Sequence, residues 1–167
     1  DTPEWRCACT FATSCVHRPS RIDIHGQPLR FAAHKSDMMR LDVLQEFGGV
    51  YVDHDAFVLR SFDDLRRCTP QSMRAGYEFF QRDKHKMNNG VLLARRGAAF
   101  LSLWRDSYRE YRKGEWDYNS CVVPFQLAIE RPELVFLDPT LGPLPRYASS
   151  AEYARHLANA PVVHITG

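Results

Sequence analysis

The segment from His34 to Leu65 restricts the possible folds of this 167-residue chain more than any other. It begins with the spacing of an amphipathic helix over residues 36–47, with Ser36 as a favourable N-cap and Gly48-Gly49 as the stop signal. The apolar run Val50–Val52 follows at once and ends at an aspartate. A short apolar run bounded in this way predicts a buried, central strand. The segment therefore predicts one helix–strand unit of an α/β sheet.

Two carboxylates, Asp53 and Asp55, follow this strand with one residue between them. Because side chains alternate along an extended backbone, both carboxylates are expected on one side and His54 on the other. Two hard oxygen ligands suit Mg²⁺ or Mn²⁺ when water and a substrate phosphate fill the remaining coordination positions. The sequence thus predicts a divalent-cation site at the end of this strand.

The helix before the strand carries an acidic and a basic residue three positions apart, Asp37 and Arg40. Met38, Leu41 and Leu44 are expected to face the core, which places the charged pair on another face. Asp37 would lie in the first helical turn, where the helix dipole favours an anion. Taken alone, the pair is typical of a weak salt bridge on a solvated surface. Next to the two aspartates it becomes a candidate ligand contact, and both interpretations stay open.

Strands and helices alternate along the rest of the chain, which predicts an α/β sheet with helices on its faces and ligands beyond its strand ends. A short strand is expected at 21–24, with a turn at Gly26. Further strands are expected at 56–59, 74–78, 91–94, 134–137 and 162–164, and helices at 61–65, 100–111, 120–131 and 151–158.

Three polar sites accompany these later elements. Asn88-Asn89-Gly90 is a turn signal before the strand at 91–94. Asn119 or Ser120 is expected to cap the helix that ends before Pro132. His164 follows the last apolar strand, as the aspartates follow theirs, and this makes it a candidate ligand although a lone histidine there is usually structural.

Composition narrows the possible partners. The 22 basic and 20 acidic residues nearly cancel and form no long basic run, so a nucleic-acid groove has little support. No apolar run has the length of a membrane span, and the first residues do not resemble a signal peptide. A membrane anchor, if the protein has one, is expected outside this chain.

Three of the five cysteines, Cys7, Cys9 and Cys15, lie close together near His17 and His25. A zinc site is conceivable, but the paired spacing of common structural zinc sites is absent. Disulfides or free thiols are the favoured interpretation.

Several of these motifs together resemble DXD glycosyltransferases of the GT-A type. They are Ser36-Asp37-x-x-Arg40, the run from Gly48 to Asp55, Asn88-Asn89-Gly90-Val91 and the segment Trp116–Pro124. The most similar group contains the initiating α-1,6-mannosyltransferases and the α-1,4-galactosyl- and N-acetylglucosaminyltransferases, with the large clostridial glucosylating toxins as distant relatives. The resemblance implies a GT-A-like, Rossmann-related mixed sheet flanked by helices. It divides the chain into a cysteine-containing segment, 1–33, and a catalytic region, 34–167.

The resemblance also implies a reaction. A sugar would pass from a UDP- or GDP-sugar to a carbohydrate-bearing acceptor, a glycan, glycolipid or glycoprotein, with retention of configuration and with Mn²⁺ or Mg²⁺ as cofactor. Golgi or other secretory-pathway localisation is implied if the organism is eukaryotic. The implied catalytic and metal-binding residues are Asp53 and Asp55, with Asp55 the direct ligand and His164 completing the metal shell. The implied donor-sugar contacts are Asp37, Arg40, Asn89 and Asn119.

The sequence also departs from this family. Relatives hold the nucleoside base with an N-terminal half, whereas only a short stretch precedes the motif here, so a partial domain is expected. A non-catalytic, carbohydrate-binding transferase fragment is therefore one alternative. A phosphohydrolase of the haloacid dehalogenase type is another, less favoured because Phe57 stands where that family has Thr or Val.

Overall fold

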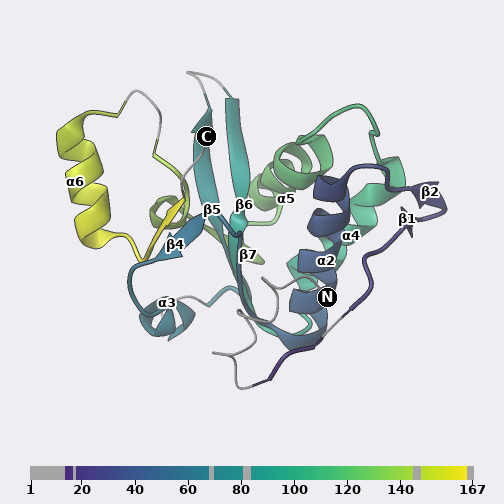
Figure 1. Ribbon diagram of the computed structural model, residues 1–167, viewed down its shortest axis with the longest axis horizontal. Coiled ribbons are helices and arrows are strands. Elements are labelled where there is room, and N and C mark those ends of the chain that lie inside the picture. The colour runs from purple at the N-terminus through teal and green to yellow at the C-terminus, as the bar shows by residue number, and fades with distance from the viewer. Residues whose placement is uncertain (1–13, 17, 68–69, 81–83, 145–147, 165–167) are drawn as a thin grey trace.

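The computed structural model describes residues 14–16, 18–67, 70–80, 84–144 and 148–164 (Figure 1). Its centre is a four-stranded mixed sheet in the order β3-β6-β5-β7, in which β5 and β7 run parallel and the other neighbours antiparallel. The strands are β3 Gly49–Val52, β5 Met73–Phe80, β6 Lys84–Ala94 and β7 Val135–Asp138. The predicted mixed α/β sheet is confirmed.

In the described part of the chain, three helices cover one face of this sheet, and two helices with a pair of short strands lie on the other (Figure 1). On the first face α2 (Ala32–Phe47), α4 (Ala99–Ser107) and α5 (Val123–Glu130) enclose the main core. The opposite face carries α3 (Asp63–Arg67), α6 (Ser150–Asn159) and the antiparallel pair β4 (Ala56–Val58) and β8 (Val162–His164). Short elements complete the described fold: the hairpin β1 (Asp23–Ile24) and β2 (Gln27–Pro28), η1 (Tyr108–Glu110), η2 (Tyr118–Val122) and η3 (Pro139–Leu141).

The main core is built from the apolar stripes that the sequence predicted. Met38, Leu41 and Leu44 of α2 are buried in it. The large side chains of the helix predicted at 100–111 are also buried there; they are Phe100, Leu101, Trp104, Tyr108 and Tyr111. Among the described residues, no helix is long and apolar enough to cross a membrane.

The helix before the DXD segment ends as predicted but begins earlier. Gly48, with φ of 67°, ends α2 and donates its N–H to the Leu44 carbonyl at 2.8 Å. The predicted N-cap at Ser36 is wrong: α2 begins at Ala32 after Phe31, and Ser36 lies inside the helix. The serine hydroxyl instead lies 3.3 Å from Nη2 of Arg40. A good capping residue type did not cap because four further residues join the helix before it.

The strand after the glycines is not central. β3 forms an edge of the described sheet, and its Val50 is 37% exposed, so the prediction of a buried, central strand is wrong. A run of three apolar residues does not distinguish an edge from a centre, because that depends on which strands pair beside it.

The prediction that Asn88-Asn89-Gly90 forms a turn before a strand is also wrong, because these residues lie within β6. Pairing with β5 jumps from Ala75↔Leu92 to Gly76↔Asn88, and three residues of β6 stand out of that ladder. We call Asn89–Val91 the β6 bulge. Its Val91 still pairs with Val52 of β3 on the other side. An irregularity of this kind redirects side chains beside a strand end.

Two further sequence-based predictions concern side chains away from the sheet. Asn119 and Ser120 lie inside η2, one turn of π-helix, so the predicted cap at either residue is wrong. Cys15 is disulfide-bonded, whereas Cys7, Cys9 and His17 lie outside the described residues. The division of the chain at residue 33 stays a prediction.

Candidate functional site

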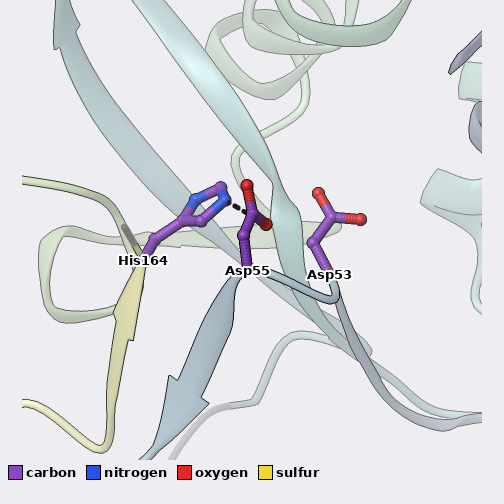
Figure 2. A group of neighbouring side chains, drawn as sticks. All are labelled: Asp53, Asp55 and His164. Atoms are coloured by element: carbon purple, nitrogen blue, oxygen red, sulfur yellow. Dashed lines mark hydrogen bonds and ion pairs between the residues drawn. The ribbon is translucent and has the colours of Figure 1, made fainter. Parts of the chain in front are cut away.

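The end of β3, the start of β4 and the end of β8 bring three candidate ligands together (Figure 2). Asp53 follows β3, Asp55 precedes β4, and His164 ends β8, whose pairing partner at this point is Ala56. One ligand atom of each of the three lies within 4.8 Å of the others. Nε2 of His164 is hydrogen-bonded to Oδ1 of Asp55 at 3.0 Å. The β4–β8 pair therefore explains how a histidine far along the chain reaches the DXD segment.

The two oxygens of Asp53 have different surroundings. Oδ1 accepts a hydrogen bond from the Tyr51 hydroxyl at 2.5 Å and lies 3.4 Å from Nη2 of Arg40. Oδ2 lies beside Gly90 and His164 instead. The Asp53 N–H donates to the Gly90 carbonyl at 2.8 Å, which fixes the backbone as well. One oxygen is thus held by the protein and the other faces the ligand cluster.

Gly90, in the β6 bulge, leaves room for this cluster. A Cβ built on it would lie 2.7 Å from Cε1 of His164, 3.0 Å from Oδ2 of Asp53 and 3.2 Å from Nδ1 of His164. The sequence reading assigned Gly90 to a turn and missed this role. The available signal was a glycine within an apolar strand pattern, which often marks a close approach of other groups.

The buried side chain of Arg40 connects α2 to Asp53 and to the β6 bulge. Its Nη1 donates to the Asn89 carbonyl at 2.6 Å, and its Nη2 lies 3.4 Å from both Oδ1 of Asp37 and Oδ1 of Asp53. Its guanidinium also lies over the Tyr51 ring, 4.6 Å from the centroid. The side chains of Asp37 and Arg40 are each only 6% exposed. The solvated-surface interpretation of this pair is therefore wrong.

Asp37 is an unusual carboxyl despite its basic partner. Burial raises its pKa to about 6, and the charge of Asp53 adds to the rise. Arg40 and the 3.1 Å hydrogen bond from the Asn89 side chain oppose it without cancelling it. An ion pair would by itself lower a carboxyl pKa, so desolvation is the larger effect here. Of the predicted sugar contacts, the structure gathers Asp37, Arg40 and Asn89 beside Asp53.

Asn119 makes a different set of contacts. Its side-chain oxygen accepts from the Arg112 N–H at 2.9 Å, and its amide donates to the Glu110 carbonyl at 3.4 Å. Its own carbonyl accepts from the Trp104 indole at 2.9 Å. These bonds connect η2 to the end of α4, so the contacts described for Asn119 are structural ones.

The donor set suits a hard divalent cation. Asp53, Asp55 and His164 bring two carboxylates and one imidazole together. Asp37 adds a third carboxyl group only through its contact with the Arg40 guanidinium, which also contacts Asp53. Adjacent ligands of an octahedral Mg²⁺ or Mn²⁺ lie about 3 Å apart and opposite ones about 4 Å apart. One ligand atom of each of Asp53, Asp55 and His164 lies within 4.8 Å of the others, and Nε2 of His164 lies 3.0 Å from Oδ1 of Asp55. Nδ1 of His164 is buried and has no hydrogen-bond partner in the described structure. The residues present therefore fit such a cation.

Comparison with known proteins follows this geometry. Residues 16–73 match the family described as glycosyltransferase sugar-binding region containing DXD motif. This match includes Asp37, Arg40, Asp53 and Asp55 and ends before Asn89. The DXD glycosyltransferase region expected from the sequence is confirmed for that segment.

Three curated proteins have similar sequences, and two of them are named glycosyltransferases. The chain is 33% identical over 117 residues to Glucan organizing enzyme 1 of Cryptococcus neoformans var. grubii serotype A, an alignment covering 65% of this chain and 31% of that protein. It is 31% identical over 84 residues to Glycosyltransferase afumC of Aspergillus fumigatus, covering 46% and 21%. It is 26% identical over 90 residues to O-glycosyltransferase braB of Annulohypoxylon truncatum, covering 50% and 20%. The alignments thus span less than a third of each relative.

A solved structure shares the fold. It is the apo-form glycosyltransferase GlyE of Streptococcus pneumoniae, with a TM-score of 0.50 and 14% identity. The similarity covers 87% of this chain and 40% of the other chain. At this identity it supports the fold alone.

Proposed function

We propose, from the premise that this chain contains a glycosyltransferase sugar-binding region with a DXD motif, that it holds the diphosphate of a nucleotide sugar through a divalent cation. The donor would be a UDP- or GDP-sugar and the acceptor a carbohydrate-bearing molecule. The observation that carries this proposal is the convergence of Asp53, Asp55 and His164 at the ends of β3 and β8 and the start of β4.

In this proposal Asp55, His164 and Oδ2 of Asp53 hold Mn²⁺ or Mg²⁺. When bound, the cation would neutralise the charge that develops on the departing nucleoside diphosphate. Tyr51 and Arg40 hold Oδ1 of Asp53 and so orient Oδ2 toward the cation. Because its guanidinium is engaged by the Asn89 carbonyl and by Asp53, we assign Arg40 mainly this positioning task, with Asp37 and Asn89 bordering the donor sugar.

We also propose that transfer retains the anomeric configuration and that the protein acts in the secretory pathway. Support for retention comes from the resemblance to the mannosyl- and galactosyltransferase group, and the anomer of the product by NMR tests it. The disulfide at Cys15 supports an oxidising compartment such as the Golgi lumen.

The test is release of UDP or GDP from a panel of nucleotide sugars with Mn²⁺ or with a chelator. We expect cation-dependent hydrolysis that falls at least about a hundredfold in Asp55→Asn, because a metal ligand is lost while side-chain size is kept. Asp64→Asn, an exposed carboxyl at the start of α3, is the matched control and should retain activity. Equal activity in the two variants would refute the proposal. Cation-dependent binding without turnover would favour the non-catalytic alternative.

A further inference from the structure

Three aromatic rings meet at the start of α2, and we call Phe31, His34 and Trp116 the aromatic shelf. The Phe31 and His34 rings pack edge to face with centroids 5.4 Å apart, and His34 and Trp116 lie 6.3 Å apart at an angle of 42°. His34 is buried, whereas Phe31 is 53% and Trp116 70% exposed. Two broad aromatic surfaces therefore face solvent on either side of one buried ring.

The shelf lies at the same end of the sheet as the DXD cluster. Because α2 leads through Gly48 into the first residue of β3, the start of α2 lies at the end of β3 from which Asp53 follows. The chain between α4 and α5, which carries Trp116, passes over this end of the helical layer (Figure 1).

Contacts within the helical layer connect the shelf to Asp37. His34 and Asp37 are three residues apart and share a helix face. Nδ1 of His34 is hydrogen-bonded to the Tyr111 hydroxyl. Burial raises the pKa of Tyr111, and the charge of Asp37 raises it further, so that carboxylate acts on the tyrosine. The rings are thus continuous with the residues assigned to the donor side.

We propose that the aromatic shelf binds a pyranose ring of the carbohydrate acceptor. This inference rests on the proposed function and adds the acceptor side to it. The face of an aromatic ring is electron-rich, and the axial C–H groups of a sugar carry partial positive charge, so the two stack. Glu115 and Asp117 flank Trp116 in the sequence and pair with Arg112 and Lys86, respectively. Each carboxylate has further lone pairs that can accept hydrogen bonds from sugar hydroxyls.

A sugar fits this surface better than a protein partner does. Trp116 is the single large apolar residue in a segment of charged residues and glycine, 112–117. Protein-binding surfaces need contiguous apolar area, and stretches such as the exposed run Phe57, Val58 and Leu59 come closer to that description. An exposed ring in a segment that also carries two carboxylates matches the mixed apolar and hydroxylated surface of a pyranose.

The experiment is saturation-transfer NMR of the wild-type chain with α-1,6-mannobiose, lactose and cellobiose. We expect saturation transfer to one or more of these sugars. Binding should be roughly tenfold weaker in Trp116→Ala and in Phe31→Ala, because each substitution removes one stacking contact. Trp116→Phe should retain most of the binding because it keeps a ring. Phe57→Ala is the control, since Phe57 is as exposed as Phe31 and lies on β4.

Two results would overturn the acceptor shelf: no saturation of any of these sugars by the wild type, or binding that Trp116→Ala and Phe57→Ala change equally. Nucleotide-sugar hydrolysis by the same wild-type preparation separates this proposal from the proposed function. Saturation that depends on Trp116, without cation-dependent hydrolysis, would leave the shelf standing and refute the transferase site.

Discussion

Replacement of Gly90 by alanine tests the candidate cation site most directly. The added Cβ would lie 2.7 Å from Cε1 of His164, whereas carbon atoms in ordinary contact are about 3.5–4 Å apart, so the ring would have to retreat by about 1 Å. Oδ2 of Asp53, 3.0 Å from the same Cβ, would also have to give way. Overpacking of this kind costs about 1–3 kcal/mol when nothing relaxes.

We expect the loss to appear in cation binding rather than in folding. His164 ends β8 and can shift its ring, but a displacement of about 1 Å exceeds the tolerance of a binding constellation, which is about 0.5 Å. Gly90→Ala should therefore lower cation-dependent hydrolysis by about a hundredfold and weaken Mn²⁺ affinity in calorimetry, with a small fall in the melting temperature. Gly114→Ala is the control, because a Cβ there meets nothing within 4 Å.

A double-mutant cycle decides whether the clash with His164 is the cause. In His164→Ala two of the three contacts of the new Cβ, including the shortest, are gone, so adding Gly90→Ala should cost much less than it does in the wild type. Additive losses, or unchanged Mn²⁺ affinity in Gly90→Ala, would refute this reasoning.

Two further predictions concern the groups around Asp53. Tyr51→Phe removes the hydrogen bond to Oδ1 and should lower Mn²⁺ affinity about tenfold with little change in melting temperature; an unchanged affinity would show that Arg40 alone holds that oxygen. Asp37→Asn should stabilise the fold at pH 8 by up to about 3 kcal/mol. The folded-state pKa of Asp37 is raised to about 6, so ionisation of this buried carboxyl lowers the free energy of unfolding of the wild type as pH rises from about 4 through 6. Urea unfolding of both proteins from pH 4 to pH 8 measures it, and a variant less stable than the wild type at pH 8 would contradict it.

The parts of the site that the sequence predicted are those set by local rules. The apolar run correctly placed Asp53 after a strand, and the glycine stop correctly marked the end of α2 before β3. The prediction of an extended backbone between Asp53 and Asp55 is wrong, because Ala56 donates its N–H to the Asp53 carbonyl at 3.1 Å and closes a turn there. The pattern of an apolar strand that ends in a ligand type identified His164. Each inference needed only neighbouring residues.

The parts that failed depend on pairing between distant segments. Whether β3 is central or at an edge is decided by β6, and the burial of Arg40 is decided by Tyr51 and Asn89. A single sequence carries no signal for such contacts beyond the residue types themselves. The buried salt bridge was for this reason indistinguishable from a surface one.

The β6 bulge explains why several of these failures coincide. Its three residues leave the ladder with β5 while Val91 keeps its pairing with β3. The excursion offers the Asn89 carbonyl to Arg40 and the Gly90 carbonyl to Asp53, and it leaves the gap that His164 approaches. In a regular strand these three functions would need separate elements. A single irregularity therefore couples the helix, the DXD segment and the last strand, and the missing Cβ of Gly90 leaves the space into which His164 and Asp53 reach.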